Sequence, residues 1–157
     1  MLYFNPLVFL SILNVMSPLY LIFYFCDTFT GVLGKIFKAR DISFQNMGAD
    51  QLESVALKNS GDQSIFHRCS FMSQQVSIHS DHVGQQLYHD CYISGSQHLI
   101  YGDGHAMFQR STIHVNNLKP EVGAVIALQE RRSKFLVGGG LYFIYVPFLL
   151  VPKKVHK

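Results

Sequence analysis

A short motif recurs three times along this chain, and its spacing limits the folds that the chain can adopt. Each copy places an aromatic residue, two polar residues, a small residue, one further residue and then a large apolar residue. The copies lie at residues 65–71 (IFHRCSF), 87–93 (LYHDCYI) and 107–113 (MFQRSTI). The small residues of the motif, Cys69, Cys91 and Ser111, are therefore 22 and 20 residues apart. A repeat of this size indicates coils that stack on one another.

The central copy has the alternating pattern of a β-strand with two different faces. Residues 87–93 alternate in this way, residues 94–96 form a turn, and residues 98–101 form a second short strand. Residues 76–78 and 124–128 take the place of that second strand after the first and third copies. Each coil is therefore expected to carry at least two strands.

Strands at this spacing leave no room for the helices that βαβ units require. Equivalent strands of successive coils would instead lie parallel to one another. The pattern predicts an all-β fold, a right-handed parallel β-helix of about four coils. A looser copy of the motif at residues 41–44 supplies the earliest coil, because Ile42 stands 27 residues before Cys69.

Stacking of the coils predicts columns of inward-facing side chains. One column contains Ile42, Cys69, Cys91 and Ser111, and another contains Phe44, Phe71, Ile93 and Ile113. Two states are open for the two cysteines. Free cysteine is among the most buried residue types, so both could be core thiols. Strands about 4.8 Å apart would also bring the two Cα atoms within reach of a disulfide between neighbouring coils.

The composition is that of a single globular domain. The chain has 157 residues, of which 48% are apolar, so it can bury a core. Its formal charge of +3 comes entirely from Lys153, Lys154 and Lys157, and no basic surface for nucleic acid is expected. Three cysteines are too few for a disulfide-based scaffold.

Both ends of the chain differ from the middle. Residues 1–26 carry no charged side chain and could span a bilayer, so a signal peptide, a membrane anchor and a non-native end are all open. Residues 135–152 are also uncharged, which leaves open a membrane contact or a few apolar strands. These changes in composition divide the chain into an apolar N-terminal segment (1–26), a β-helix (27–134) and an apolar C-terminal segment with a basic tail (135–157).

Four short stretches of the chain follow one another in a recognisable order. They read FKARDISFQN (37–46), VALK (55–58), SGD (60–62) and DCYISG (90–95). Together they resemble the plant pectinesterases, or pectin methylesterases, over about residues 27–133. The resemblance implies a right-handed parallel β-helix that lacks early and late turns of the family. It also implies a secreted cell-wall protein that removes methyl esters from polygalacturonate without a cofactor.

Family members use one aspartate as nucleophile and a second aspartate as general acid and base, and the resemblance assigns both positions here. The family's nucleophile lies in the motif GSIDFIFG, and residues 95–102 of this chain read GSQHLIYG. His98 therefore stands in place of the nucleophile. The second aspartate follows a glutamine in the motif QDTL, and residues 75–78 read QVSI. Val76 stands there and cannot transfer a proton.

Glutamines of the family stabilise the oxyanion that forms when the ester is attacked. Gln75 keeps this identity, whereas Glu53 replaces the other glutamine, and its carboxylate would repel an oxyanion. The family's GRPW segment, whose arginine and tryptophan contact the substrate, is absent, and the chain contains no Trp. The resemblance thus implies a family member whose catalysis is abolished or severely impaired.

Other functions remain open at this point. The chain could be a non-enzymatic β-helix that binds acidic polysaccharide, either secreted or membrane-anchored, or an incomplete chain without a stable fold. A rebuilt hydrolase would need Glu53, His98 and Ser77 to come together, which no spacing in the sequence requires.

The histidines raise the question of a metal site. Seven of the eight fall between His67 and His114, and His67 and His89 occupy equivalent positions of the repeat. The remaining histidines scatter over turns and faces, while a metal site needs three or four ligands to converge. We therefore expect no metal site.

Overall fold

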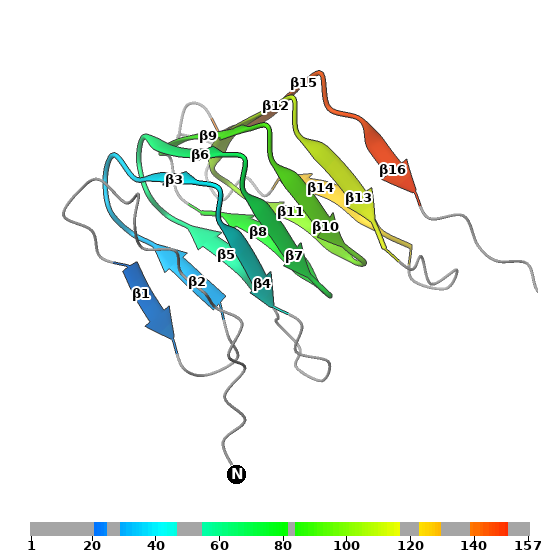
Figure 1. The fold of residues 1–157 in the computed structure, drawn as a ribbon, viewed down its shortest axis with the longest axis horizontal. Coiled ribbons are helices and arrows are strands. Elements are labelled where there is room, and N and C mark those ends of the chain that lie inside the picture. Colours follow the sequence, from blue (N-terminus) through cyan, green and yellow to red (C-terminus); the bar gives the residue numbers. More distant parts are fainter. Residues whose placement is uncertain are drawn as a thin grey trace, which may run out of the picture.

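The fold is a stack of β-strand coils, seen in a computed structural model that describes residues 21–24, 29–46, 55–81, 84–116, 123–129 and 139–150 (Figure 1). The first sheet has the order β1 (Leu21–Tyr24), β2 (Phe29–Val32), β5 (Val55–Asn59), β8 (Val76–Ser80), β11 (His98–Gly102) and β14 (Val125–Gln129). The second has the order β15 (Gly140–Ile144), β12 (His105–Gln109), β9 (Gln85–His89), β6 (Ser64–His67) and β3 (Lys38–Arg40). The third has the order β16 (Phe148–Leu150), β13 (Thr112–Val115), β10 (Tyr92–Gly95), β7 (Ser70–Ser73) and β4 (Ser43–Asn46).

Each coil contributes one strand to each sheet, and the coils run from β2–β3–β4 to β14–β15–β16. All pairings between coils are parallel, while β1 pairs antiparallel with β2. The chain is therefore a parallel β-helix, as the repeat predicted. It has five coils where about four were expected, because β15 and β16 add strands within the apolar C-terminal stretch.

The segment boundaries set at residues 26 and 134 remain predictions. The first sheet begins before residue 26 with β1, and the second and third sheets continue past residue 134 with β15 and β16. Residues 1–20 and 151–157 lie outside the described residues. Within the described part of the chain, no helix has the length and apolar character that crossing a bilayer requires.

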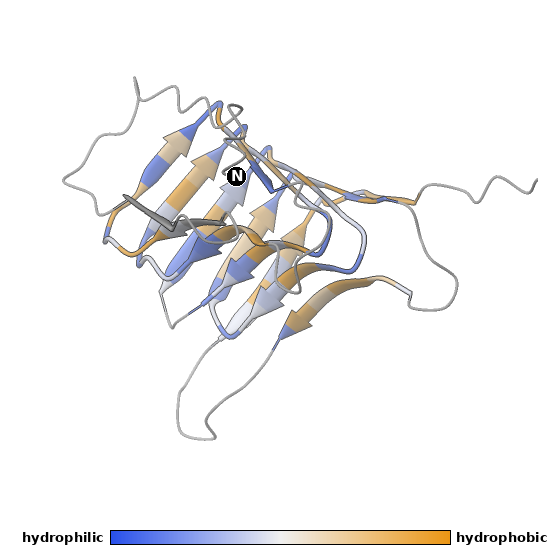
Figure 2. Cartoon of the chain, turned by 90° about the horizontal axis from the view of Figure 1, so that it is seen from below, coloured by the Kyte–Doolittle hydropathy of each residue, from blue (hydrophilic) through white to orange (hydrophobic). Residues whose placement is uncertain are grey.

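Stacked aromatic rings form the centre of the core. The ring of Tyr88 lies 5.0 Å from that of Phe66 and 4.7 Å from that of Phe108, and both pairs are nearly parallel. Phe44 and Phe71 stack in the same way at 5.1 Å. Apolar and polar residues interleave along the strands, as one buried and one outward face require (Figure 2). The predicted column Phe44, Phe71, Ile93 and Ile113 is confirmed by the strand register.

The column of small residues is also buried, and its two cysteines are free thiols rather than a disulfide. Burial raises the pKa of the Cys91 thiol to about 12 and also raises that of Cys69. Ser111 continues the column, and its hydroxyl accepts a hydrogen bond from the backbone N–H of Cys91 at 3.1 Å. Of the two states open from the sequence, the structure has the buried thiols.

A buried polar network lies where the first sheet turns into the second. The amide of Asn59 donates to Ser64 Oγ at 2.7 Å and to the hydroxyl of Tyr88 at 3.1 Å. Tyr88 and Ser80 in turn donate to Gln86 Oε1, each at 3.0 Å, and Gln86 Nε2 donates to the carbonyl of Asn59 at 2.9 Å. The network satisfies its own polar groups, so their burial does not carry the cost of an unmade hydrogen bond.

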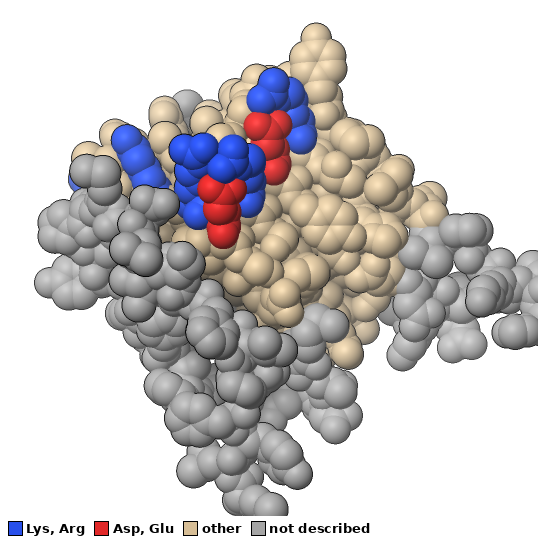
Figure 3. All heavy atoms as spheres, viewed as in Figure 1, with Lys and Arg blue, Asp and Glu red and all other residues tan. Residues whose placement is uncertain are grey.

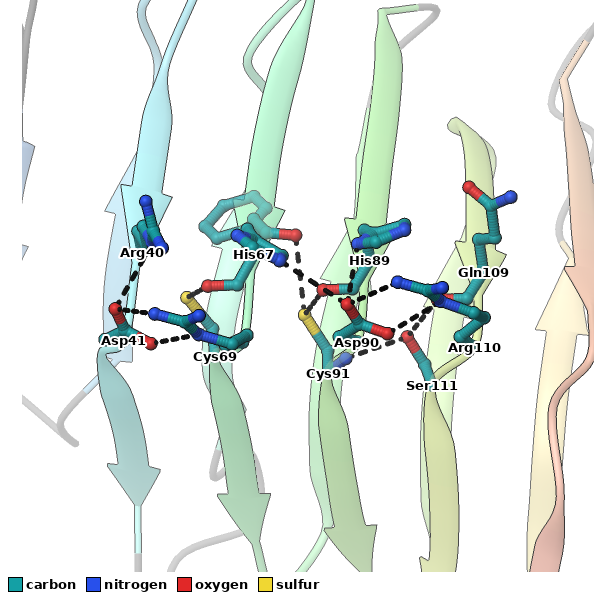
Figure 4. Close-up of polar contacts among 12 residues, drawn as sticks. Arg40, Asp41, His67, Cys69, His89, Asp90, Cys91, Gln109, Arg110 and Ser111 are labelled. Carbon is teal, nitrogen blue, oxygen red and sulfur yellow. Dashed lines mark hydrogen bonds and ion pairs between the residues drawn. The ribbon is translucent and has the colours of Figure 1, made fainter.

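The corner between the second and third sheets places one residue per coil in the left-handed backbone region. These residues are Asp41 (φ 58°), Arg68 (φ 52°), Asp90 (φ 54°), Arg110 (φ 50°) and Tyr145 (φ 52°). The side chains of the first four form a column of alternating charge. Arg68 binds both carboxylate oxygens of Asp41 at 2.6 Å, and Arg110 binds both of Asp90 at 2.9 Å. Figure 3 shows charged side chains gathered along this edge of the molecule, and Figure 4 shows the pairs in detail.

These ion pairs make stability depend on pH in the acid range. Hydrogen bonds from Arg68 and Arg110 lower the pKa of Asp41 and of Asp90, respectively, below their usual 3.8. A lowered folded-state pKa contributes stability above the unfolded-state pKa and loses it as the pH falls through the folded-state value. We expect the melting temperature to fall from about pH 5 to about pH 2 more steeply in the parent than in an Asp41→Asn/Asp90→Asn variant. Equal slopes of melting temperature against pH in the two proteins would contradict a stabilising role for these Arg–Asp ion pairs.

The aromatic stack predicts a large difference between two neighbouring positions of β12. Phe108 is fully buried between the rings of Tyr88 and Phe143, whereas Met107 is 36% exposed. Phe108→Ala should lower the free energy of unfolding by about 3–5 kcal/mol through lost burial and a residual cavity. Met107→Ala, the matched control, should cost about 1 kcal/mol or less. Urea unfolding followed by circular dichroism measures both, and similar losses would rule out the stack as the main core.

Candidate functional site

One row across the first sheet contains both positions that the resemblance assigns to catalytic aspartates. Val76 opens β8 and His98 opens β11, and the two residues are register partners on neighbouring parallel strands. Val55 on β5 and Val125 on β14 continue the row on either side. Neighbouring strands lie about 4.8 Å apart, so the side chains of Val76 and His98 adjoin each other. Both residues are half-buried at the surface of the sheet.

Gln75 lies beside this row, in the turn that leads into β8. Its carbonyl accepts the backbone N–H of His98 at 2.9 Å, and its own N–H donates to Ser73 Oγ at 3.3 Å. The carbonyl of Gln97 accepts the N–H of Val125 in the same way, one coil further on. The backbone of Gln75 is therefore fixed next to Val76 and His98, while the oxyanion-binding role of its side chain stays a prediction.

Glu53, the other predicted oxyanion position, lies outside the described residues. Its role, and the repulsion of an oxyanion that its carboxylate would cause, therefore stay predictions. Of the four predicted site residues, the structure brings together Gln75, Val76 and His98.

Ser77 follows Val76 but belongs to the interior of the β-helix. Its side chain is fully buried, and its hydroxyl donates to the carbonyl of Ser94 at 2.8 Å. Gly95 permits this close approach, since a Cβ at residue 95 would come within 2.7 Å of Ser77 Oγ. Ser77 is consequently unable to act as a nucleophile beside His98, which rules out this residue in a rebuilt hydrolase.

The row offers an imidazole and no carboxylate among the described residues. His98 makes no ion pair with a described Asp or Glu. The ion pair of this sheet joins Lys58 Nζ and Asp81 Oδ2 at 3.3 Å, and Lys58 lies three residues along β5 from Val55, or about 10 Å. An acyl-enzyme mechanism with two carboxylates cannot be assembled from Val76 and His98.

A second row follows the first sheet at the level of Lys58. Lys58 aligns with His79 on β8, which aligns with Tyr101 on β11. The rings of His79 and Tyr101 pack with their centroids 5.0 Å apart, and all three side chains are half-buried. No sequence motif indicates this row, because its members lie 21 and 22 residues apart and meet only when the coils stack. The row supplies an ammonium group, paired with Asp81, and aromatic surface about 10 Å from the altered positions.

A third polar cluster lies at the charged corner, away from these rows. The sequence placed His67 and His89 at equivalent positions, and the structure adds Asp90, whose carboxylate reaches both imidazoles. The motif gave no signal of this convergence, because it depends on the left-handed backbone of Asp90.

Comparison with known proteins gives one consistent family. The family model for pectinesterases matches residues 21–142. The probable pectinesterase/pectinesterase inhibitor 36 of Arabidopsis thaliana is 41% identical over 102 residues, which are 64% of this chain and 20% of that protein. The pectinesterase/pectinesterase inhibitor PPE8B of Prunus persica is 36% identical over 103 residues, 65% of this chain and 20% of that protein. The chain thus spans about a fifth of the length of these curated relatives.

A solved structure resembles the fold as a whole. The pectin methylesterase from carrot superimposes with a TM-score of 0.65 at 27% sequence identity, over 77% of this chain and 39% of that chain. This match confirms the right-handed parallel β-helix that the repeat and the motifs predicted.

Proposed function

The chain belongs to the pectinesterase family. From this premise we propose that it is a secreted cell-wall protein of pectin modification whose own ester cleavage is impaired. The relatives are pectinesterases by name, and pectin is the substrate class that they indicate. Impaired catalysis is supported by one observation: Val76 and His98, which the resemblance assigns to the positions of the two aspartates, are register partners on neighbouring strands. An isopropyl group and an imidazole there provide neither a carboxylate nucleophile nor a carboxyl proton donor.

Removal of a catalytic group lowers kcat strongly in other hydrolases. Removal of the nucleophile alone costs roughly 10⁶-fold in kcat in a serine protease, because the remaining groups cannot replace the covalent step. His98 could in principle accept a proton from water, but it lacks a described carboxylate partner that would orient the ring and stabilise its charged form. Hydrogen bonds fix the backbone of Gln75 next to this row.

A second function is favoured by the row of Lys58, His79 and Tyr101. Polygalacturonate carries one carboxylate per sugar when its methyl esters are removed, and a sugar ring also presents an apolar face. Lys58 offers its ammonium group to the former in competition with Asp81, which lies 3.3 Å from it, and the rings of His79 and Tyr101 offer stacking surface to the latter. Binding of acidic polysaccharide without ester cleavage is therefore the alternative function of the same sheet.

The first test compares ester cleavage with binding. The parent protein should release no methanol from methylated pectin above a blank without protein, because the row lacks carboxylates. It should bind demethylated polygalacturonate in a salt-sensitive manner, and Lys58→Gln should weaken that binding while Lys38→Gln, on the second sheet, should not. Methanol release by the parent would refute impaired catalysis. Binding unaffected by Lys58→Gln would refute the role of this row.

The second test asks whether the absence of the two aspartates is the sole cause of the impaired ester cleavage. We expect that Val76→Asp/His98→Asp/Glu53→Gln will not restore methanol release. The substrate-orienting segment with its tryptophan is absent, and positioning alone is worth about 7–11 kcal/mol of barrier. The matched control is Val76→Asn/His98→Asn/Glu53→Gln, which adds similar polarity without carboxylates. Circular dichroism verifies that both variants fold, and release by the Asp variant clearly above the Asn control would overturn the expectation.

A further inference from the structure

Two histidines and an aspartate meet at the corner between the second and third sheets, on a different part of the surface from the Val76–His98 row. His67 ends β6 and His89 ends β9, and the two are register partners on adjacent coils. Asp90 follows His89 in the left-handed corner, which turns its carboxylate back toward both imidazoles (Figure 4). We propose that His67, His89 and Asp90 bind a divalent transition-metal ion of the zinc type.

The distances fit a tetrahedral ion. His67 Nε2 lies 3.4 Å from Asp90 Oδ2, His89 Nδ1 lies 3.0 Å from the same oxygen, and the three atoms all fall within 4.8 Å of one another. Zinc bonds of about 2.0–2.1 Å in tetrahedral geometry place neighbouring ligand atoms about 3.3 Å apart. Rotation of the half-buried His67 and His89 side chains would therefore suffice to enclose an ion. Two imidazoles and one carboxylate form a donor set that zinc accepts, with a water molecule as the fourth ligand.

Arg110 holds the cluster in place, and solvent can reach it. Arg110 holds the two oxygens of Asp90 at 2.9 Å, which orients the carboxylate as an outer-shell partner does in metal sites. The side chains of His67, His89 and Asp90 are 33%, 26% and 30% exposed, so an ion and its water can reach them from solvent. The imidazole rings lie 5.2 Å apart and are tilted by 47°, so the ring nitrogens are not blocked by face-to-face stacking.

The charges around the cluster partly offset one another. Arg110 and the nearby Arg68 oppose a dication, while Asp90 supplies one compensating negative charge. A histidine nitrogen binds a metal ion only when it carries no proton, so the ion would replace any proton on His67 Nε2 and His89 Nδ1.

The ion would link two neighbouring coils. His67 belongs to the coil of β5, β6 and β7, whereas His89 and Asp90 belong to the coil of β8, β9 and β10. An ion held only when these coils are in register binds the folded chain and not the unfolded one, so the melting temperature should rise as the free ion concentration increases above the Kd.

The experiment measures Zn²⁺ binding to the full chain by calorimetry and by thermal unfolding at pH 7.5. The parent should bind one Zn²⁺ at this site and melt at higher temperature when Zn²⁺ is added. His67→Gln and His89→Gln should each weaken binding by at least the about 10-fold that loss of an outer-shell partner costs. The matched controls His79→Gln and His105→Gln remove described histidines elsewhere on the β-helix and should bind as the parent does. Co²⁺ in place of Zn²⁺ should give the intense visible absorption of a tetrahedral site in the parent and in the two control variants, but not in His67→Gln or His89→Gln.

Arg110→Gln separates ligand loss from loss of the corner ion pair. This variant breaks the pair with Asp90 but keeps the carboxylate, so it should still bind Zn²⁺, whereas Asp90→Asn should not. Parent-like binding by His67→Gln and His89→Gln would overturn the proposal. So would equal losses in the two control variants, or the absence of any Zn²⁺-dependent change in the parent.

Discussion

Parallel hydrogen bonding between coils is the constraint on which the rest of this structure depends. It continues through the corners as well as the strands, because the left-handed residues Asp41, Arg68 and Asp90 donate their backbone N–H groups to the next coil, each at 3.0 Å. A shift of one residue in the pairing register of a strand would turn every side chain of that strand to the opposite face of its sheet. The same register that buries Phe66 against Tyr88 therefore sets Val76 beside His98 and His67 beside His89.

The scaffold and the chemistry of this chain are separable. The pairing of β8 with β11 would set two carboxylates side by side as readily as it sets a valine beside a histidine, since the backbone hydrogen bonds do not depend on those side chains. A fold can thus be inherited while its reaction is altered, and function has to be argued from the site. Here the altered positions are the basis for the proposal of impaired ester cleavage, and the half-buried row of Lys58, His79 and Tyr101, about 10 Å away, is the basis for the proposal of binding to an acidic polymer.

The repeat predicted the β-helix and the core columns, because the side-chain period and the coil spacing both follow from the order of residues. The pairing of Val76 with His98 was not predicted, since it depends on the register of β8 and β11. For residues 135–152 a few apolar strands were one of the open possibilities, and the packing of β15 on β12 selects it. The network of Asn59, Gln86 and Tyr88 was also beyond sequence reasoning, because its members are 27 and 29 residues apart along the chain and meet only through stacking. Asp90 joins the histidines for a similar reason, through a backbone conformation that no motif encodes.

The stacking of one coil directly on the next has a consequence for how the chain folds. Residues that pair in neighbouring coils, such as Phe44 with Phe71 or Phe71 with Ile93, are separated by about one coil length of sequence. The contact order is therefore low for an all-β protein, and loop closure costs little entropy at each addition. During synthesis from the N-terminus, every new coil can dock on the one already formed, so assembly can proceed vectorially without waiting for distant segments.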